Sequence, residues 1–343
     1  MPCLGAIYGF LLYVVMPHFI SLATPLGSEC LRAAHKTHRH ARHARQNAPQ
    51  TRALHSRPAF LCNTRFVGVV RPLALVTGGS AGIGRELSEL LANDGYDLVI
   101  TGSSARVDAA AEDLRALGAD VVAVKSDLAT EAGNEAVFAA VLATGRTPAV
   151  AIFNAGIATG GAHFTAISLS RHLSLMALNM QSPVRLAHAL VPRMVATGAG
   201  KIMFVSSISA TTPTPFEGVY GPSKAFLSSF GFGLREELVG TGVDVTVMCP
   251  GATATEFHAR AGFKLGESRL GDNSWKNDPK SVAQQGYDAM LRGDAQVVCG
   301  DEATQEASRL HARLSEEEKA RRHAEIARQR ACEKLESQTE EEI

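Results

Sequence analysis

From residue 73 onward, short and continuously apolar runs alternate with stretches of mixed polarity. Runs such as LALVT and VTVM have the length of strands, and they have no polar face. Such runs are typical of strands buried on both sides, as in parallel sheets. The pattern predicts six strands, at residues 73–77, 97–101, 121–124, 149–153, 201–205 and 243–248.

The stretches between these runs have helical spacing, most clearly at residues 85–91, 107–117 and 131–142. Strand and helix in repeated alternation, with short connections, predict an α/β fold whose doubly wound parallel sheet is covered on both faces. No internal repeat or linker interrupts residues 73–300, so we expect one domain over 71–300.

An apolar run precedes this domain at residues 4–26. It is long enough to cross a bilayer, although Pro17 and His18 lie in its middle. No basic residue precedes the run, which argues against a cleaved signal peptide. Basic residues follow it, so insertion would anchor the chain with its catalytic domain cytoplasmic. An unstructured leader or a start codon assigned too early are the alternatives.

The formal net charge of zero conceals an asymmetry, because residues 1–70 carry eight Lys or Arg and one acid, Glu29. His35, His38, His40 and His43 have the spacing of metal ligands. We expect no metal, because the interleaved cations repel one and no acid or cysteine completes the shell. A basic linker that suits an anionic membrane surface is the better interpretation. Without interleaved aromatics, nucleic-acid binding is not expected.

Two features concern the whole chain and its other end. The six cysteines are scattered without a Cys-x-x-Cys pair, which predicts reduced thiols in a reducing compartment. Residues 301–343 are densely charged, and the run from Ser315 to Lys319 reads as a helix start. We expect a solvated, partly helical tail there.

A Gly-rich segment, LALVTGGSAGIG at residues 73–84, joins the first strand to the first helix. This is the context of a dinucleotide site, because glycines let the backbone approach a pyrophosphate and the helix N-terminus offers free N–H groups. The residues expected to form this cradle are Gly78, Ser80, Ala81, Gly82, Ile83 and Gly84.

Tyr220 and Lys224 are four residues apart and share one face if residues 220–239 are helical. A free phenol has a pKa of about 10 and is a poor acid near neutrality. A nearby ammonium stabilises the phenolate and lowers that pKa. Tyr220 is therefore a candidate acid/base for proton exchange with a carbonyl or alcohol oxygen.

These motifs, in this order, resemble the short-chain dehydrogenase/reductase family over about residues 73–300. The resemblance implies a Rossmann fold and an oxidoreductase that moves hydride between a nicotinamide and a carbonyl or secondary alcohol. Tyr220-Gly-Pro-Ser-Lys-Ala-Phe followed by Arg235-Glu-Glu-Leu resembles the branch with 3-oxoacyl-CoA reductases, hydroxysteroid dehydrogenases and related bacterial enzymes. A lipid-like substrate and a homodimer or homotetramer are what the resemblance implies.

The resemblance also assigns residues. Ser207, rather than Ser206, would orient the substrate, Asn179 would hold a water for proton relay, and Lys224 would also bind the nicotinamide ribose. Phe153 stands where the family usually has an Asn, so contacts that brace the sheet differ here. The other cofactor residues that the resemblance implies are Asp127 and Leu128 near the adenine, Asn154, Ala155 and Gly156 after the fourth strand, and Pro250, Gly251, Thr253 and Thr255 on the nicotinamide side.

The end of the second strand bears on the choice of cofactor. An acid there would hold a ribose 2′-OH and repel a 2′-phosphate, but this chain has none before Asp108. Ser103 and Ser104, with Arg106 or Arg85, are candidates for the phosphate, so we expect NADP(H) rather than NAD(H). Alternatively, the serines cap the next helix and leave the choice open.

Residues 256–276 are the expected substrate lid, with an apolar side formed by Phe257, Phe263, Leu265, Leu270 and Trp275. Packing of these side chains on the sheet edge is the alternative. A serine hydrolase is disfavoured, because no Gly-x-Ser-x-Gly stands at a strand-to-helix turn. A non-catalytic NADP-binding sensor on the same fold is the more serious alternative.

Overall fold

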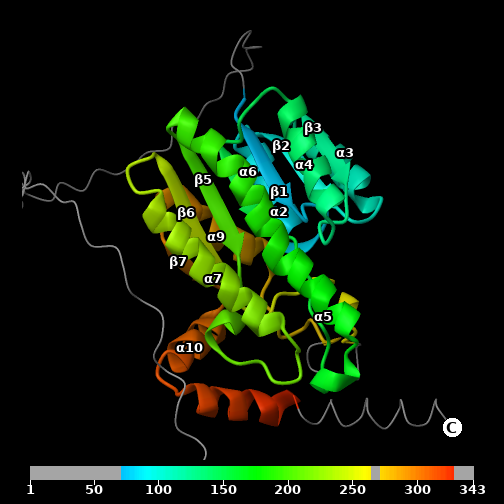
Figure 1. The fold of residues 1–343 in the computed structure, drawn as a ribbon, viewed down its shortest axis with the longest axis vertical. Coiled ribbons are helices and arrows are strands. Elements are labelled where there is room, and N and C mark those ends of the chain that lie inside the picture. The colour runs from blue at the N-terminus through cyan, green and yellow to red at the C-terminus, as the bar shows by residue number, and fades with distance from the viewer. Residues whose placement is uncertain (1–70, 264–270, 328–343) are drawn as a thin grey trace, which may run out of the picture. The chain divides into compact units, whose positions relative to one another are not determined.

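The computed structural model describes residues 71–263 and 271–327, and these form a seven-stranded sheet with helices on both faces (Figure 1). All neighbouring strands are parallel, in the order β3-β2-β1-β4-β5-β6-β7. The predicted Rossmann fold and its six strands are confirmed, and β7 is an addition. The strands are β1 Leu73–Thr77, β2 Asp97–Gly102, β3 Val121–Lys125, β4 Val150–Phe153, β5 Gly200–Val205, β6 Val243–Pro250 and β7 Gln296–Cys299.

The two faces of the sheet are covered by different helices because successive strand residues point in opposite directions. Ala74 and Val76 of β1 pack with α2 (Gly82–Asn93), α3 (Arg106–Ala116) and α9 (Pro279–Arg292). Leu73 and Leu75 pack in the second core. Its helices are α4 (Glu131–Ala143), α6 (Ser182–Thr197) and α7 (Tyr220–Glu237). In Figure 1, α7 crosses the front of the sheet and α9 lies behind it.

The strand order reverses at β1, which pairs with β2 on one side and β4 on the other. In open α/β sheets, ligands bind outside the carboxyl ends of the strands at such a switch point. The connections after β1, β2, β4 and β5 should therefore form the site.

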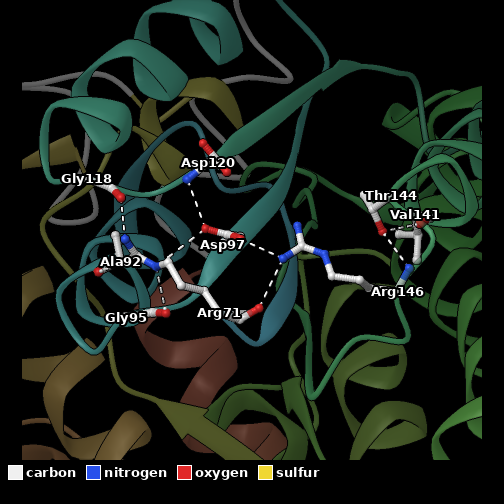
Figure 2. Close-up of polar contacts among 9 residues, drawn as sticks. All are labelled: Arg71, Ala92, Gly95, Asp97, Gly118, Asp120, Val141, Thr144 and Arg146. Atoms are coloured by element: carbon white, nitrogen blue, oxygen red, sulfur yellow. Dashed lines mark hydrogen bonds and ion pairs between the residues drawn. The ribbon is translucent and has the colours of Figure 1, made fainter. Parts of the chain in front are cut away.

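The amino ends of the strands are held together by the buried carboxylate of Asp97, the first residue of β2 (Figure 2). Asp97 forms ion pairs with Arg146 at 2.6 Å and Arg71 at 3.5 Å, and it accepts a hydrogen bond from the Asp120 N–H at 3.0 Å. Arg71 also donates to main-chain carbonyls of Gly95 and Ala92. This network ties the starts of three neighbouring strands and lies away from the carboxyl ends.

The predicted helical character of the C-terminal segment is confirmed within the described residues. Helix α10 spans Glu302–His311, and residues 316–327 form a further helix, here called the C-terminal helix. Both lie beyond the carboxyl ends of the strands (Figure 1). Residues 4–26 lie outside the described part of the chain. Among residues that are described, no helix is long and apolar enough to cross a membrane.

Candidate active site

A cavity of about 820 Å³ opens at the carboxyl ends of the strands, at the switch point. It brings together most of the residues expected from the sequence. Those that line it are Gly78, Ser80, Ala81, Gly82, Ile83, Ser103, Ser104, Asp127, Leu128, Asn154, Ala155, Gly156, Ser207, Tyr220, Lys224, Pro250, Gly251, Thr253 and Thr255. Gly84, Arg106 and Asn179 do not line it.

The Gly-rich turn presents backbone to this cavity. Gly78 and Gly82 have φ of +66° and +54°, a conformation that favours glycine. Helix α2 starts at Gly82, and no side chain caps its first N–H groups, because the N-cap residue is Ala81. Uncapped N–H groups at a helix start are suited to phosphate oxygens. The cradle therefore fits a dinucleotide pyrophosphate.

Two of the expected cofactor residues brace the turn. The Asn154 side-chain amide donates to the carbonyls of Thr77 at 3.0 Å and Gly78 at 3.2 Å. A Cβ at Gly84 would lie 2.3 Å from that amide nitrogen, so only glycine allows this close packing. Phe153, at the departure from the family pattern, is buried and stacks on Phe204 with ring centroids 5.1 Å apart.

The end of β2 carries no carboxylate into the cavity. Within the described segment 102–116, Gly102, Ser103 and Ser104 line the cavity. Arg106 is half-exposed and forms an ion pair with Glu256, at 2.5 Å. Arg85 pairs with Glu89 on its own helix and with Asp113 on α3, and it does not line the cavity.

Lys224 is buried at the centre of the site, on the first turns of α7. Its Nζ donates to the carbonyl oxygen of Val205 at 2.9 Å and lies 5.8 Å from the centroid of the Tyr220 ring. Burial disfavours the ammonium and lowers the pKa of Lys224 to about 8. The expected Tyr-Lys arrangement on one helix face is thus present.

The expected lowering of the pKa of Tyr220 is wrong for the protein as it stands in this structure. Burial of the phenol raises its pKa above the ordinary value, and the nearby Glu217 adds to the rise. A hydrogen bond with Ser207 acts in the opposite direction but does not overcome burial.

The two serines after β5 are separated by their contacts. Ser206 is buried, and its hydroxyl donates to the carbonyl of Lys224 at 2.8 Å and contacts the Ser228 hydroxyl at 2.8 Å. Both serines line the cavity, and Ser207 is the one that bonds to Tyr220. Its hydroxyl also accepts from the N–H of Ser209 at 3.0 Å. Ser207 is therefore the serine that faces a substrate.

Asn179 is completely buried in a π-helical turn, Ala177–Gln181, between α5 (Leu169–Met176) and α6. Its Oδ1 accepts from the N–H of Ile157, and its Nδ2 donates to the carbonyl of the same residue, both at 2.9 Å. A Cβ on Gly156 would lie 3.2 Å from Asn179 Oδ1 and 3.4 Å from Lys224 Nζ. Asn179 thus fixes the backbone next to the ammonium.

The substrate end of the cavity includes residues from two parts of the chain. Phe257, on α8 (Phe257–Arg260), lies 5.7 Å from the Tyr220 ring, and Phe263 and Trp275 also line the cavity. Leu265 and Leu270 of the expected lid lie outside the described residues. Sequence reasoning missed Glu217 and the C-terminal wall, formed by Leu310, His311, Leu314, Lys319, Arg322, His323, Glu325 and Ile326. The described C-terminal segment is thus more than a solvated tail.

Comparisons with known proteins agree with this geometry. The family model for short chain dehydrogenases matches residues 72–264, more than half of the chain. Sulfoacetaldehyde reductase 2 of Chromohalobacter salexigens is 33% identical over 187 residues, which cover 54% of this chain and 74% of that protein.

Solved structures show the same fold. A short-chain dehydrogenase from Sphingobium yanoikuyae in complex with NADPH is 30% identical, has a TM-score of 0.63, and is matched over 71% of this chain and 93% of its own. A Burkholderia phymatum family member in complex with NAD is 22% identical, with a TM-score of 0.61 and coverage of 70% and 92%. This chain belongs to the short-chain dehydrogenase/reductase family and is an oxidoreductase that acts on alcohol and carbonyl groups.

Proposed function

We propose that this protein is an NADP(H)-dependent reductase of bulky, largely apolar ketones, and oxidises the corresponding secondary alcohols in reverse. The observation that carries this proposal is the meeting of Ser207, Tyr220 and Lys224 in the cavity that begins at the Gly-rich turn. The same cavity ends at an aromatic and aliphatic wall. Cofactor, proton donor and substrate space are therefore continuous.

In the proposed mechanism, the cavity beside the Gly-rich turn would hold NADPH, which would provide the hydride for the carbonyl carbon. The Tyr220 hydroxyl, held by Ser207, donates a proton to the carbonyl oxygen. Ser207 also lines the cavity, and its hydroxyl stabilises the negative charge that develops on the carbonyl oxygen. Lys224, fixed by the Val205 carbonyl, supplies positive charge beside the phenol and so favours its ionised form.

Asn179 has a positioning role in this proposal. It holds both backbone polar groups of Ile157 and donates to the Ser223 hydroxyl at 3.0 Å, so the segment 156–157 is fixed next to Lys224. π-Helical turns are frequent at functional sites. A proton leaving Tyr220 would pass through this region.

The preference for NADP(H) rests on Ser103 and Ser104 at the end of β2 and on the absence of a carboxylate that lines the cavity within residues 102–116. Arg106 follows these serines and can turn from Glu256 toward a phosphate, since its ion pair is exposed. Michaelis constants for NADPH and NADH test this directly. A lower constant for NADH would contradict the preference.

The substrate class rests on the apolar residues of the wall, including Phe257, Phe263, Trp275, Leu310 and Ile326. Burial of such surface favours a bulky apolar ligand by roughly 25 cal/mol per Å². NADPH oxidation over ketones of increasing apolar size should give a rising kcat/KM. Turnover of small polar carbonyls alone would contradict this class, and tight NADPH binding without any turnover would favour a cofactor sensor.

A further inference from the structure

Glu217 lies at the substrate side of the cavity, three residues before Tyr220, and its side chain is largely buried. Its Oε1 lies 3.4 Å from Nε2 of His323. His323 belongs to the C-terminal helix and also lines the cavity. This contact joins the last described helix to the loop that leads into the helix carrying the candidate acid/base.

The loop holds Glu217 in place. The Glu217 carbonyl accepts from the N–H of Tyr220 at 3.2 Å and from the Thr159 hydroxyl at 2.8 Å. Phe216 has φ of +69°, a strained conformation for a bulky residue that persists only when the surroundings impose it. The carboxylate is therefore carried by a backbone that is fixed relative to Tyr220.

The contact between Glu217 and His323 is favourable for both side chains. A carboxylate close to a buried phenol disfavours the phenolate, and Glu217 does raise the pKa of Tyr220. Nδ1 of His323 is buried and has no hydrogen-bond partner among the described residues, so Nε2 toward Glu217 is where its ring meets an acceptor. A hydrogen-bond donor or a positive charge at Nε2 stabilises the Glu217 carboxylate and so weakens its effect on the Tyr220 phenol.

Other charged groups face this pair. Lys224 lies beside the Tyr220 ring, and Lys319 and His323 lie close enough to His311 that both lower its pKa, after burial. Lys319 is paired with Glu316 at 2.6 Å. Arg322 and Glu325, on the same helix, line the cavity and are paired with Glu318 and Arg321. Of these groups, His323 is the one in contact with Glu217.

We propose that Glu217 and His323 are a positioning pair through which the C-terminal helix sets the proton affinity of Tyr220. The proposal rests on the proposed function, because it concerns the acid/base of that reaction. It makes proton transfer depend on docking of a segment that lies beyond the matched family region, residues 72–264.

The test is the pH dependence of kcat for alcohol oxidation, which rises as Tyr220 loses its proton. Glu217→Gln should move the midpoint to lower pH by about one pH unit. His323→Leu leaves the carboxylate without a donor or charge at this position and should move the midpoint to higher pH by about half a pH unit. In the double variant the His323 substitution should have no further effect, because its partner charge is gone.

Glu317→Gln is the matched control, since it makes the same chemical change on the same helix at an exposed residue that does not line the cavity. Glu217→Asp withdraws the charge by one methylene and should shift the midpoint in the direction of Glu217→Gln, which covers poor folding of that variant. An unchanged midpoint in either single variant, or a His323→Leu shift that persists in the double variant, would overturn the proposal.

A wild-type chain that turns over no carbonyl or alcohol would contradict the proposed function. The contact between Glu217 and His323 is then tested by a second measurement, which does not need activity. Hydrogen exchange of residues 316–327 should then show the same loss of protection in Glu217→Gln and His323→Leu, with no further loss in the double variant. Full protection in both single variants would show that the pair does not hold the helix, and would overturn the inference independently of activity.

Discussion

Arg106 and Glu256 form an ion pair 150 residues apart in the sequence, with Arg106 Nη1 2.5 Å from Glu256 Oε2. The pair connects the start of α3, next to the expected ribose position, with the residue before α8 at the substrate side. Glu256 also binds Arg260 at 2.6 Å. Exposed ion pairs are weak, so a phosphate can compete with Glu256 for the guanidinium.

Replacing Arg106 tests that competition. Arg106→Gln should raise the Michaelis constant for NADPH about tenfold, because a charge-assisted hydrogen bond is lost, and should leave that for NADH unchanged. Steady-state kinetics with both cofactors measure this. Arg115→Gln, a control on the same helix whose partner is Glu112, should change neither constant. Equal effects on both cofactors would argue against a phosphate contact.

The two serines after β5 offer a matched pair. Ser207→Ala should lower kcat about 100-fold, because a donor to the developing negative charge is lost. Ser206→Ala removes the hydrogen bond to the Lys224 carbonyl, so it should lower the free energy of unfolding by about 1 kcal/mol and change kcat much less. Kinetics and urea unfolding of both variants separate these effects, and the reverse ranking in kcat would refute the assignment.

Lys224 should show a conflict between stability and activity. Its pKa is lowered from 10.5 to about 8, so the folded chain bears the cost of a buried ammonium below about pH 8, and this cost disappears as pH rises toward 10.5. Lys224→Met should therefore abolish turnover while the free energy of unfolding at pH 7 stays equal or rises, by at most about 3 kcal/mol. Strong destabilisation of this variant at pH 7 would contradict this.

The same group predicts a pH effect on cofactor use. The kcat/KM for NADPH reports the free enzyme, and Lys224 is proposed to hold the nicotinamide ribose as a cation. We expect kcat/KM to fall as pH rises through about 8, where the ammonium loses its proton. A profile that is flat between pH 7 and 9 would show that this charge is not needed.

At the amino ends of the strands, away from the candidate site, Asp97 should matter for stability alone. Asp97→Asn weakens its ion pairs with Arg71 and Arg146 (Figure 2), and urea unfolding should show a loss of about 1–3 kcal/mol. NADPH affinity should not change. Asp120→Asn is the control, since Asp120 uses only its main-chain N–H in this network. A large change of NADPH affinity in Asp97→Asn would show that the amino ends of the strands are not independent of the candidate site.

The sequence predicted the sheet well because six of its strands contain continuous apolar runs, whereas β7 is an edge strand whose first residue, Gln296, is polar. Local order also placed the motifs correctly, because each follows a strand that ends at the same edge. Ser207 bonds to Tyr220 in the structure, and its choice over Ser206 as the substrate-orienting serine stays a prediction.

Contacts between residues far apart in the sequence could not be predicted from local patterns. Nothing near Arg106 in the sequence indicates Glu256, and nothing near Tyr220 indicates His323, because both contacts depend on how distant helices pack. The direction of the pKa change at Tyr220 was missed because burial is a property of the folded chain. Asn154 lines the cavity as expected, but its bonds to the turn that forms the cradle, from Nδ2 to the carbonyls of Thr77 and Gly78, were not foreseen.

The central claim is that Tyr220 transfers the proton in an NADPH-dependent carbonyl reduction. The most direct measurement is NADPH oxidation with a bulky apolar ketone by the wild-type chain and by Tyr220→Phe, together with the dissociation constant for NADPH. We predict turnover by the wild type, a fall in kcat of about 1,000-fold or more in the variant, and unchanged NADPH binding. Similar kcat values in both proteins would contradict the account.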